Sequence, residues 1–363
     1  DVFLISGAED LVPDLRPDGS RFEDLSADGF VIHRFRPRIE GLFMRIERWT
    51  NLNTADIHWR TYTGGNNVSI YGRTENSRIF DPDDPSRVFA WLICESRDDK
   101  GNAVLYEYAA ENAENVDALS ASERNRTVQA NRYLKRVKYG NKRPLAPGDD
   151  VRAADWMFEA VFDYDEGHVS EAPGGGEAGE GKDREFVSAV PTKTWAVRPD
   201  PFSRCRSGFE VRTYRRCRRM LMFHHFEELG GGPYLVRSLE FGYADFDAAG
   251  DVSAEAELLH PGSTRLASFL CSVTEAGYLR TDSADAGSSG VQMYVRQRMP
   301  PIEFEYGKLA FGNGIRESAA EGPERMPPGS PDAASFWVDL NRDGVPDILT
   351  ERLGCWYWVP NLG

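Results

Sequence analysis

Short runs in which apolar and polar residues alternate recur between residues 30 and 141 of the chain. A period of two places successive side chains on opposite faces of a strand, and aromatic and β-branched residues enrich these runs. We therefore expect strands at residues 30–36, 41–49, 57–63, 68–72, 88–96, 103–108 and 131–141. Many short strands predict a mainly β protein built on a multi-stranded antiparallel sheet or sandwich.

Two turn sequences join neighbouring runs and predict hairpins. Gly64-Gly65-Asn66-Asn67 separates the runs 57–63 and 68–72. Asp98-Asp99-Lys100-Gly101-Asn102 separates the runs 88–96 and 103–108 and forms a charged tip that contains glycine. Glycine and asparagine tolerate the positive φ angles that tight hairpin turns require.

Helical patterns are sparse, and we expect one or two short helices in all. The best candidate is residues 115–130, where Ser120 and Glu123 have the spacing of a capping box and charge pairs follow. Residues 131–141 then return to the strand pattern.

Three segments are rich in glycine, proline or acidic residues and lack apolar periodicity. They are residues 170–185, 283–290 and 317–335, and we expect solvated loops at all three. The last of them contains four prolines and is interpreted as a linker. A domain boundary is therefore expected near residue 300.

The composition fits a folded protein and limits its class. The chain has 363 residues, of which 40% are hydrophobic, and 34 glycines and 21 prolines suit many strands joined by turns. A net charge of −15 argues against a dedicated nucleic-acid binder. The five cysteines are scattered without a CxxC motif, so we expect reduced, structural thiols: Cys94, Cys205, Cys217, Cys271 and Cys355.

No apolar run approaches the ~18 residues that a membrane-spanning helix needs. No signal peptide is recognisable, and the chain starts at Asp1 instead of a methionine. Because the first residues open directly into a strand pattern and the last look like a strand cut short, we expect a segment of a longer polypeptide.

The most specific local motif lies near the C-terminus. Oxygen-bearing side chains fall at i, i+2, i+4 and i+8, and a glycine follows the third of them. This layout is typical of a loop that collects hard oxygen ligands for Ca²⁺, although no twelfth-position glutamate and no flanking helices make it an EF-hand. The candidate metal ligands are Asp339, Asn341, Asp343, Val345 and Asp347. Aromatic and β-branched neighbours indicate one blade of a β-propeller.

An arginine-rich run stands out in the otherwise acidic chain. Residues 209–226 contain five arginines within the eight positions 212–219. One interpretation is an anion-binding or partner-binding patch. The other, which we favour, is a strand whose outward arginines pair with acids on neighbouring strands. His224 and His225 are adjacent, so in a strand they face opposite sides and cannot easily share one metal.

Motifs for catalysis are weak, and we expect a protein that is not an enzyme. The sequence contains no GxSxG, no HExxH and no P-loop. Glu255 and Glu257 have the spacing of the paired glutamates of mono-ADP-ribosyltransferases, but the supporting Ser-Thr-Ser motif is missing upstream. Such a pair also arises easily by chance among 58 acidic residues.

Several long blocks resemble one known family. Residues 3–13, 35–43, 45–49, 131–141 and 216–226 are similar, in order, to the N-terminal module of SpvB-type proteins. The family comprises the Salmonella virulence plasmid B protein and the B components of insecticidal Tc toxin complexes. The tail from about residue 335 resembles the first FG-GAP-type propeller repeat that follows this module in Tc B components.

The resemblance implies an architecture and a function. It implies a β-rich shell module at residues 1–300, a linker at 301–335 and a first, truncated propeller repeat at 336–363. In Tc toxins the B and C components enclose a toxic enzyme in a β-sheet shell, and the propeller docks on the pore-forming A component. We therefore expect a non-catalytic structural and delivery segment of a secreted toxin, with C and A components as partners. The transferase of the SpvB line lies at a distant C-terminus and is absent from these residues.

One alternative from another class stays open. The chain could be a free-standing β-rich module that uses the Ca²⁺ loop and exposed aromatics such as Trp356 and Trp358 to bind a protein or glycan.

Overall fold

The computed structural model describes residues 2–359 except for several segments. The residues outside the description are 1, 7–9, 27, 42, 121–122, 128, 172–181, 231, 245–267, 282–289, 307–334, 341–345, 353 and 360–363. The chain divides into two compact units, Asp1–Lys308 and Leu309–Gly363. The division lies eight residues beyond the expected boundary near residue 300, and the expected three-part organisation stays a prediction.

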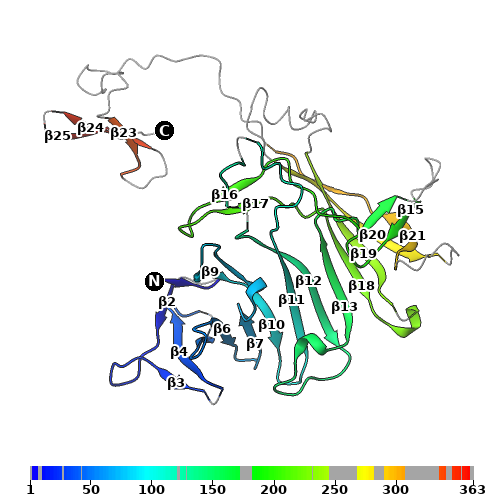
Figure 1. Ribbon diagram of the computed structural model, residues 1–363, viewed down its shortest axis with the longest axis horizontal. Coiled ribbons are helices and arrows are strands. Elements are labelled where there is room, and N and C mark those ends of the chain that lie inside the picture. The colour runs from blue at the N-terminus through cyan, green and yellow to red at the C-terminus, as the bar shows by residue number, and fades with distance from the viewer. Residues whose placement is uncertain are drawn as a thin grey trace. The chain divides into compact units, whose positions relative to one another are not determined.

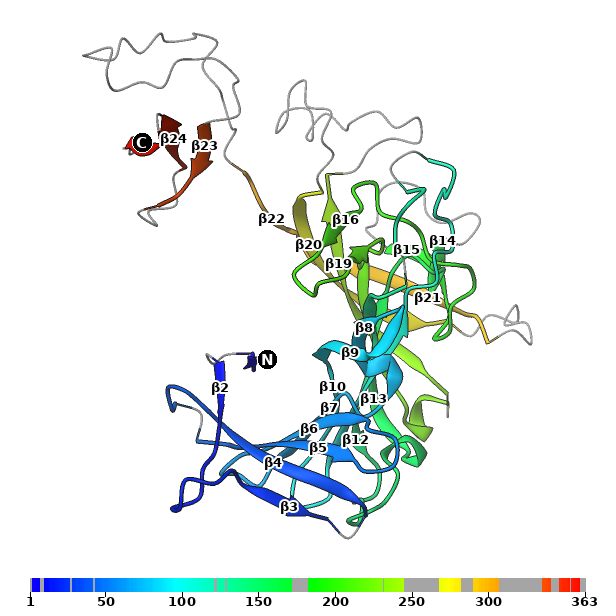
Figure 2. The same ribbon diagram turned by 60° about the vertical axis from the view of Figure 1, so that its left-hand side comes forward.

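The first unit is built on one 18-stranded sheet whose pairings are all antiparallel. Its N-terminal half runs by direct pairing from β1 to β12, and neighbouring strands can be followed in Figures 1 and 2. The strands in pairing order are β1 (Phe3–Leu4), β2 (Asp10–Pro13), β4 (Phe30–Pro37), β5 (Arg45–Asn51), β6 (Ile57–Tyr62), β7 (Val68–Tyr71), β10 (Ile93–Arg97), β11 (Ala103–Ala110) and β12 (Arg132–Asn141), with β3 (Glu23–Leu25) beside β2 on β4.

The C-terminal half of the sheet continues from β12. Its strands in pairing order are β13 (Trp156–Asp163), β18 (Arg219–His224), β19 (Tyr234–Tyr243), β20 (Leu270–Arg280), β21 (Gln292–Arg298), β15 (Lys182–Val187) and β14 (Val169–Glu171), with β22 (Ile302–Glu303) paired to β20. Residues 164–218 connect β13 to β18. Within this connection, β14 and β15 pair at the far end of the sheet.

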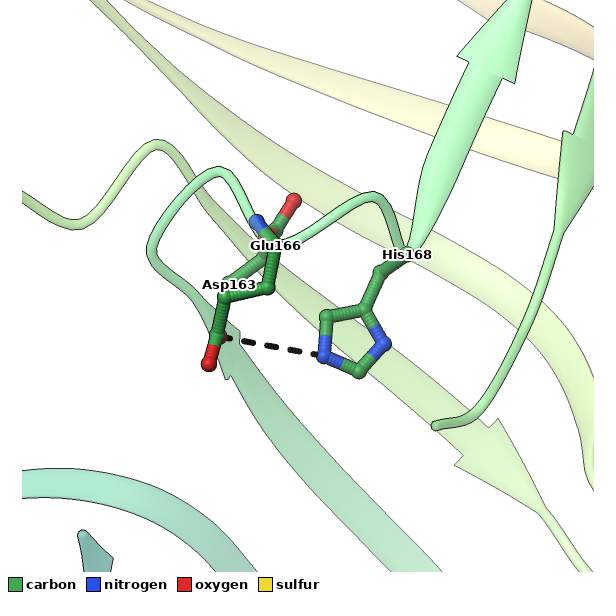
Figure 3. A group of neighbouring side chains, drawn as sticks. All are labelled: Asp163, Glu166 and His168. Carbon is green, nitrogen blue, oxygen red and sulfur yellow. Dashed lines mark hydrogen bonds and ion pairs between the residues drawn. The ribbon is translucent and has the colours of Figure 1, made fainter. Parts of the chain in front are cut away.

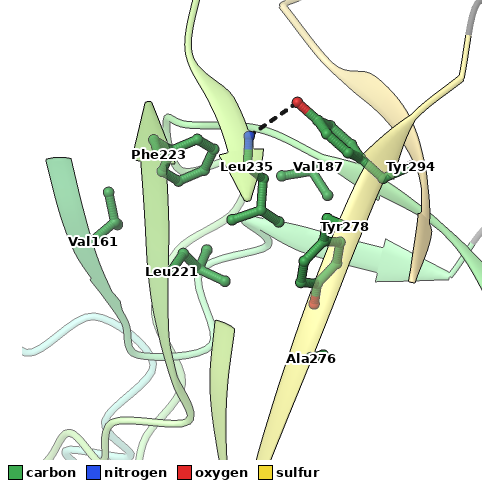
Figure 4. Packing of buried hydrophobic residues seen from close by; sticks show 8 residues of the cluster. All are labelled: Val161, Val187, Leu221, Phe223, Leu235, Ala276, Tyr278 and Tyr294. Carbon is green, nitrogen blue, oxygen red and sulfur yellow. Dashed lines mark hydrogen bonds between the residues drawn. The ribbon is translucent and has the colours of Figure 1, made fainter. Parts of the chain in front are cut away.

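This half curls so that strands distant in the pairing order share one core. Val161 on β13 and Val187 on β15 belong to the same buried cluster as Leu221, Leu235 and Tyr294 (Figure 4). The remaining members are Phe223, Ala276 and Tyr278. The Tyr294 hydroxyl accepts the Leu235 backbone N–H at 3.1 Å, so the polar end of this buried ring has a partner.

A second core supports the N-terminal half. Leu11, Ile46 and Trp59 are buried there, and Trp59 contacts the rings of Phe3, Phe35 and Trp91 in edge-on or tilted geometry. Such aromatic contacts stabilise beyond the area that they bury. Gly72 makes the approach of Trp91 possible, because it has φ +68° and a Cβ at that position would lie 2.2 Å from the indole.

Small elements complete the described fold. Two-stranded sheets are formed by β8 (Arg78–Asp81) with β9 (Asp84–Trp91) and by β16 (Phe202–Arg204) with β17 (Val211–Thr213). The second unit contains a three-stranded sheet of β23 (Ser335–Val338), β24 (Asp347–Arg352) and β25 (Cys355–Val359). Three short 3-10 helices are η1 (Glu75–Ser77), η2 (Val151–Ala153) and η3 (Glu227–Leu229).

The fold class is confirmed as mainly β with a large antiparallel sheet, and both expected hairpins form. Tyr62 pairs with Val68, and Arg97 pairs with Ala103 around Gly101 at φ +83°. The expected strand 88–96 is interrupted at Leu92, because β9 pairs with β8 whereas β10 pairs with β7 and β11.

Two expectations about local structure were wrong. Where they are described, residues 115–130 form turns, bends and irregular backbone instead of a helix. Their polar groups bind other elements: Asn115 donates to Trp195 O, and Glu123 accepts from Arg212. The expected loop 170–185 also includes strand residues, because β15 begins at Lys182 and pairs with β21.

Candidate functional site

The structure describes only part of the expected Ca²⁺ loop. Asn341, Asp343 and Val345 lie outside the described residues. Asp339 is exposed, whereas Asp347 is fully buried at the start of β24. The Asp347 Oδ2 atom accepts the Leu340 N–H at 3.3 Å and the Trp358 Nε1–H at 2.8 Å. These bonds fix the direction of the one described carboxylate that is buried in the loop.

Aromatic side chains are exposed on the three-stranded sheet of the C-terminal unit. Trp337 is 71% exposed, and four other aromatics are close to half exposed: Phe336, Trp356, Tyr357 and Trp358. Phe336 and Trp356 lie with ring centroids 6.2 Å apart. The C-terminal unit by itself therefore presents a large apolar surface.

The arginine-rich run forms ion pairs inside the protein, as the favoured interpretation required, but it does so in a different way. Arg212 binds Glu123, and Arg215 binds Glu111. Both arginines are buried, at 5% and 2% exposed, so they are not outward side chains of a surface strand. Arg219 contacts Asp163 Oδ2 at 3.2 Å across β13 and β18. The charges of Arg212, Arg215 and Arg219 are neutralised within the fold, which argues against an anion-binding role for these three residues.

Arg215 shows how thoroughly such a charge is satisfied. Its guanidinium forms a forked contact with Glu111 and also donates to the Trp195 and Glu114 carbonyls at 3.2 and 2.9 Å. The same group lies 4.5 Å from the Trp195 ring centroid. A buried ion pair needs this many partners to offset the desolvation of both charges.

The two adjacent histidines have separate environments. The His224 ring meets Phe158 edge-on, whereas His225 Nε2 lies 2.9 Å from Glu159 Oε2. Burial would raise the pKa of Glu159, but the His225 hydrogen bond and the Arg136 charge outweigh it and lower the pKa to about 2. Neither histidine belongs to a metal-like cluster among the described residues.

A compact polar cluster lies where the chain leaves β13. Asp163, Glu166 and His168 are all buried, and one ligand atom of each lies within 4.8 Å of the others (Figure 3). Burial lowers the pKa of His168, so its neutral form is favoured. The sequence interpretation did not single out this cluster. Its signal was the Asp-x-x-Glu-x-His spacing directly after a strand.

The tight turn explains how these three side chains converge. The Glu166 backbone N–H donates to Asp163 Oδ1 at 2.9 Å, and Asp165 has a φ of +65°. Lys135 on β12 contacts Glu166 Oε2 and donates to the Phe162 carbonyl at 2.8 Å. Burial lowers the pKa of Lys135 and the Glu166 carboxylate opposes that shift.

A larger cavity of about 760 Å³ lies between η1, η2 and β11. Its lining mixes Arg73, Arg97 and Arg152 with carboxylates such as Glu95 and Glu107. Several of these charges are already paired: Arg97 binds Glu95, and Lys138 lies 3.2 Å from Glu107. These pairs neutralise part of the charge on the lining.

Other candidates from the sequence have plain outcomes. The five cysteines are unpaired, with Cys205 and Cys355 exposed. Glu255 and Glu257 lie outside the described residues. Within the described part of the chain, no helix is long and apolar enough to cross a membrane.

Comparison with known proteins decides the family. Residues 1–226 match the family model described as SpvB, Salmonella virulence plasmid 65kDa B protein. The chain belongs to the SpvB family. The match ends at Phe226, directly after β18, so it covers the N-terminal half of the sheet and the arginine-rich run.

Curated relatives are similar over the same part of the chain. The mono(ADP-ribosyl)transferase SpvB of Salmonella typhimurium (strain 14028s / SGSC 2262) is 34% identical over 239 residues. This aligned region is 64% of the present chain but only 38% of that protein. The chain thus spans well under half of the length of these relatives.

Solved structures extend the likeness. The N-terminal domain of effector protein SpvB from Salmonella typhimurium strain LT2 matches with a TM-score of 0.64 and 29% identity, over 77% of this chain and 82% of that one. The TcdB2-TccC3 crystal structure matches with a TM-score of 0.63 and 26% identity, over 98% of this chain and 16% of that one. A Photorhabdus luminescens Tc holotoxin pore matches 96% of this chain with a TM-score of 0.61. The fold is therefore that of SpvB N-terminal domains and of Tc toxin components.

Proposed function

We propose that this chain is a non-catalytic structural segment of a Tc-type or SpvB-type toxin, contributing strands to a shell that encloses a toxic enzyme. The observation that carries the proposal is the likeness of 98% of the chain to a small part of TcdB2-TccC3. A long antiparallel sheet suits a wall, because each strand is held by two neighbours and one face can enclose a volume.

The chemistry of the described clusters supports a structural role. Several buried acids and bases are paired with each other, as in Arg215 with Glu111 and Arg136 with Glu159. A general base needs a free lone pair and access to substrate, and these carboxylates have neither. The transferase activity in the name of the Salmonella relatives is therefore assigned to sequence beyond the aligned 38%.

The C-terminal unit supports the remainder of the proposal. Exposed aromatics on β23–β25 fit a first propeller repeat whose sheet packs against further blades. In this proposal the propeller docks on a pore-forming A component, a C component completes the shell, and the assembled toxin acts outside the producing bacterium. We also propose that Asp339, Asn341, Asp343, Val345 and Asp347 bind Ca²⁺. Calorimetry with Ca²⁺ on wild type and Asp343→Ala tests this ligand set, and identical null traces would remove it.

The shell proposal is tested in the parent polypeptide assembled with its C component. Leu221 on β18 is fully buried in the sheet core, whereas Leu279 on β20, the second strand along from β18, is 71% exposed. Leu221→Asp should open the wall and make the enclosed enzyme sensitive to added protease. Leu279→Asp, the matched control, should leave the enzyme protected.

Equal protection in both variants, with a folded Leu221→Asp protein, would contradict a role in the wall.

The exposed tryptophans favour one other candidate, a free-standing Ca²⁺-dependent protein- or glycan-binding module. Glycan-array binding by this chain that Ca²⁺ chelation and Trp337→Ala both abolish would support that module instead.

A further inference from the structure

The turn from β13 to β14 contains a buried nitrogen that lacks a partner. His168 is completely buried, and its Nε2 atom makes no hydrogen bond. This atom lies 4.0 Å from Glu166 Oε2 and belongs to the group that Asp163 completes (Figure 3). An unpaired buried polar atom carries the full desolvation penalty of that atom, so its position requires a reason.

The other ring nitrogen defines what Nε2 can do. His168 Nδ1 lies 2.9 Å from the Ser188 carbonyl oxygen. Because a carbonyl oxygen only accepts, Nδ1 must carry the proton, and in the neutral ring Nε2 then presents a lone pair. That lone pair points toward carboxylate oxygens, which are also acceptors. A cation placed between them satisfies all of these atoms at once.

The neighbouring cations do not fill this position. Lys135 contacts Glu166 Oε2 and Phe162 O, and Arg219 contacts Asp163 Oδ2. Neither cation forms a described bond with His168 Nε2. The cluster thus keeps one nitrogen and two carboxylates oriented inward, and the nitrogen remains unpaired.

We propose that Asp163, Glu166 and His168 hold a buried zinc ion as three protein ligands, with a water molecule in the fourth position of the tetrahedron. One imidazole and two carboxylates are ligands that Zn²⁺ accepts, and the Nδ1–H bond to a backbone carbonyl is the arrangement that orients metal-bound histidines. A tetrahedral Zn²⁺ holds its ligand atoms roughly 3.4 Å apart. Small side-chain rotations therefore close the present group, and the Lys135 ammonium moves off Glu166 while its bond to Phe162 O remains.

The site would connect parts of the sheet that are distant in sequence. Asp163 ends β13, and Ser188, which holds the His168 ring, directly follows β15. The metal would therefore fix the closure of the curled C-terminal half. It uses a different part of the chain from the proposed Ca²⁺ loop and does not depend on the toxin-shell proposal.

The experiment measures zinc bound to the full chain after expression with zinc and removal of loose metal by a weak chelator. Wild type is expected to retain about one Zn²⁺ per chain, and its melting temperature should fall by roughly 5 °C when a strong chelator removes the metal. His168→Gln should lower zinc affinity at least about tenfold. His225→Gln, which alters a histidine outside the cluster, should bind as wild type does.

A second variant separates metal binding from folding. Lys135→Met removes the ammonium that competes for Glu166, so its zinc affinity should equal or exceed that of wild type. Co²⁺ in place of Zn²⁺ should give a visible absorption band in wild type and Lys135→Met. The band should be missing in His168→Gln, whose folding is checked by circular dichroism. If His168→Gln does not fold, Glu166→Gln takes its place. The proposal would be overturned if wild type retained no zinc. It would also be overturned if folded His168→Gln retained as much zinc as wild type.

Discussion

Arg215 and Glu111 form an ion pair in which both side chains are fully buried. The pair lies between the segment after β11 and the arginine-rich run, which are 104 residues apart in sequence. Such a pair contributes little net stability compared with apolar residues, but an unpaired member is strongly destabilising. Its main effect is to determine which segments can lie together.

We therefore predict opposite results for single and double changes at this pair. Arg215→Met should lower the free energy of unfolding by about 3–5 kcal/mol, because Glu111 is left charged and buried. Arg215→Met combined with Glu111→Leu should recover much of that loss in urea denaturation. The exposed pair Arg237–Glu275 is the control, and Arg237→Met should change stability by less than about 1 kcal/mol. A double variant with a lower free energy of unfolding than Arg215→Met would contradict this account.

Glu159 leads to a prediction about pH. Its pKa is lowered from 4.5 to about 2 in the folded protein, so its stabilising effect is complete above the unfolded value and disappears as pH falls toward 2. Glu159→Gln should cost roughly 3 kcal/mol at pH 7, and the difference from wild type should shrink steadily below pH 5.

Denaturation curves of wild type and Glu159→Gln from pH 7 to pH 3 test this prediction. Glu107→Gln removes the carboxylate of the more exposed Lys138–Glu107 pair and should have little effect. A pH-independent difference for Glu159→Gln would show that packing, instead of charge, is the cause.

At the scale of elements, the path of the chain between strands depends on residues that can adopt a positive φ angle at the turns. Gly72 follows β7 and precedes η1, and it allows Trp91 at the end of β9 to pack against the N-terminal core. Gly72 therefore meets two requirements at once: a positive φ angle and the absence of a Cβ atom beside Trp91.

Gly72→Ala should accordingly be severe. The new methyl group would meet Trp91 Cδ1 at 2.2 Å, and alanine disfavours a φ of +68°. Together the strain and the clash should lower the free energy of unfolding by about 3 kcal/mol or more. Gly277→Ala in β20 is the matched control, because nothing lies within 4 Å of its Cβ position and its φ is ordinary. Equal melting temperatures for both variants would contradict this account.

At the scale of the whole molecule, the chain comprises two units of very different character. Among the residues that the structure describes, four buried hydrophobic clusters lie in the first unit, whereas the three-stranded sheet of the second has aromatics that are close to half exposed or more. A three-stranded sheet that buries few apolar side chains adds little to global stability.

Residues 1–308 alone should therefore unfold within about 2 °C of the full chain, because a minor unit contributes few buried contacts. Calorimetry of both chains tests this expectation. The shorter chain should also be less prone to associate, since it lacks the exposed tryptophans of β23–β25. A markedly lower melting temperature for residues 1–308 would show that the C-terminal unit stabilises the shell module.

The sequence by itself determined the fold class, both hairpins and the family, because these depend on short-range alternation, turn residues and ordered blocks of similarity. It also favoured ion pairs for the arginine-rich run, although it placed the arginines on the outward face of a strand. It could not show that Arg212 and Arg215 are buried, since their partners Glu123 and Glu111 are about 90 and 104 residues away. For the same reason residues 115–130 were expected to be helical.

Only the tertiary structure decided how the sheet closes. Strand β15 lies in the connection between β13 and β18 and pairs with β21. No local sequence pattern encodes that pairing. The position of β15 brings Ser188 to His168 and leaves His168 Nε2 unpaired beside Asp163 and Glu166. Side-chain spacing predicts which residues share a strand face, but the convergence of buried groups depends on long-range packing.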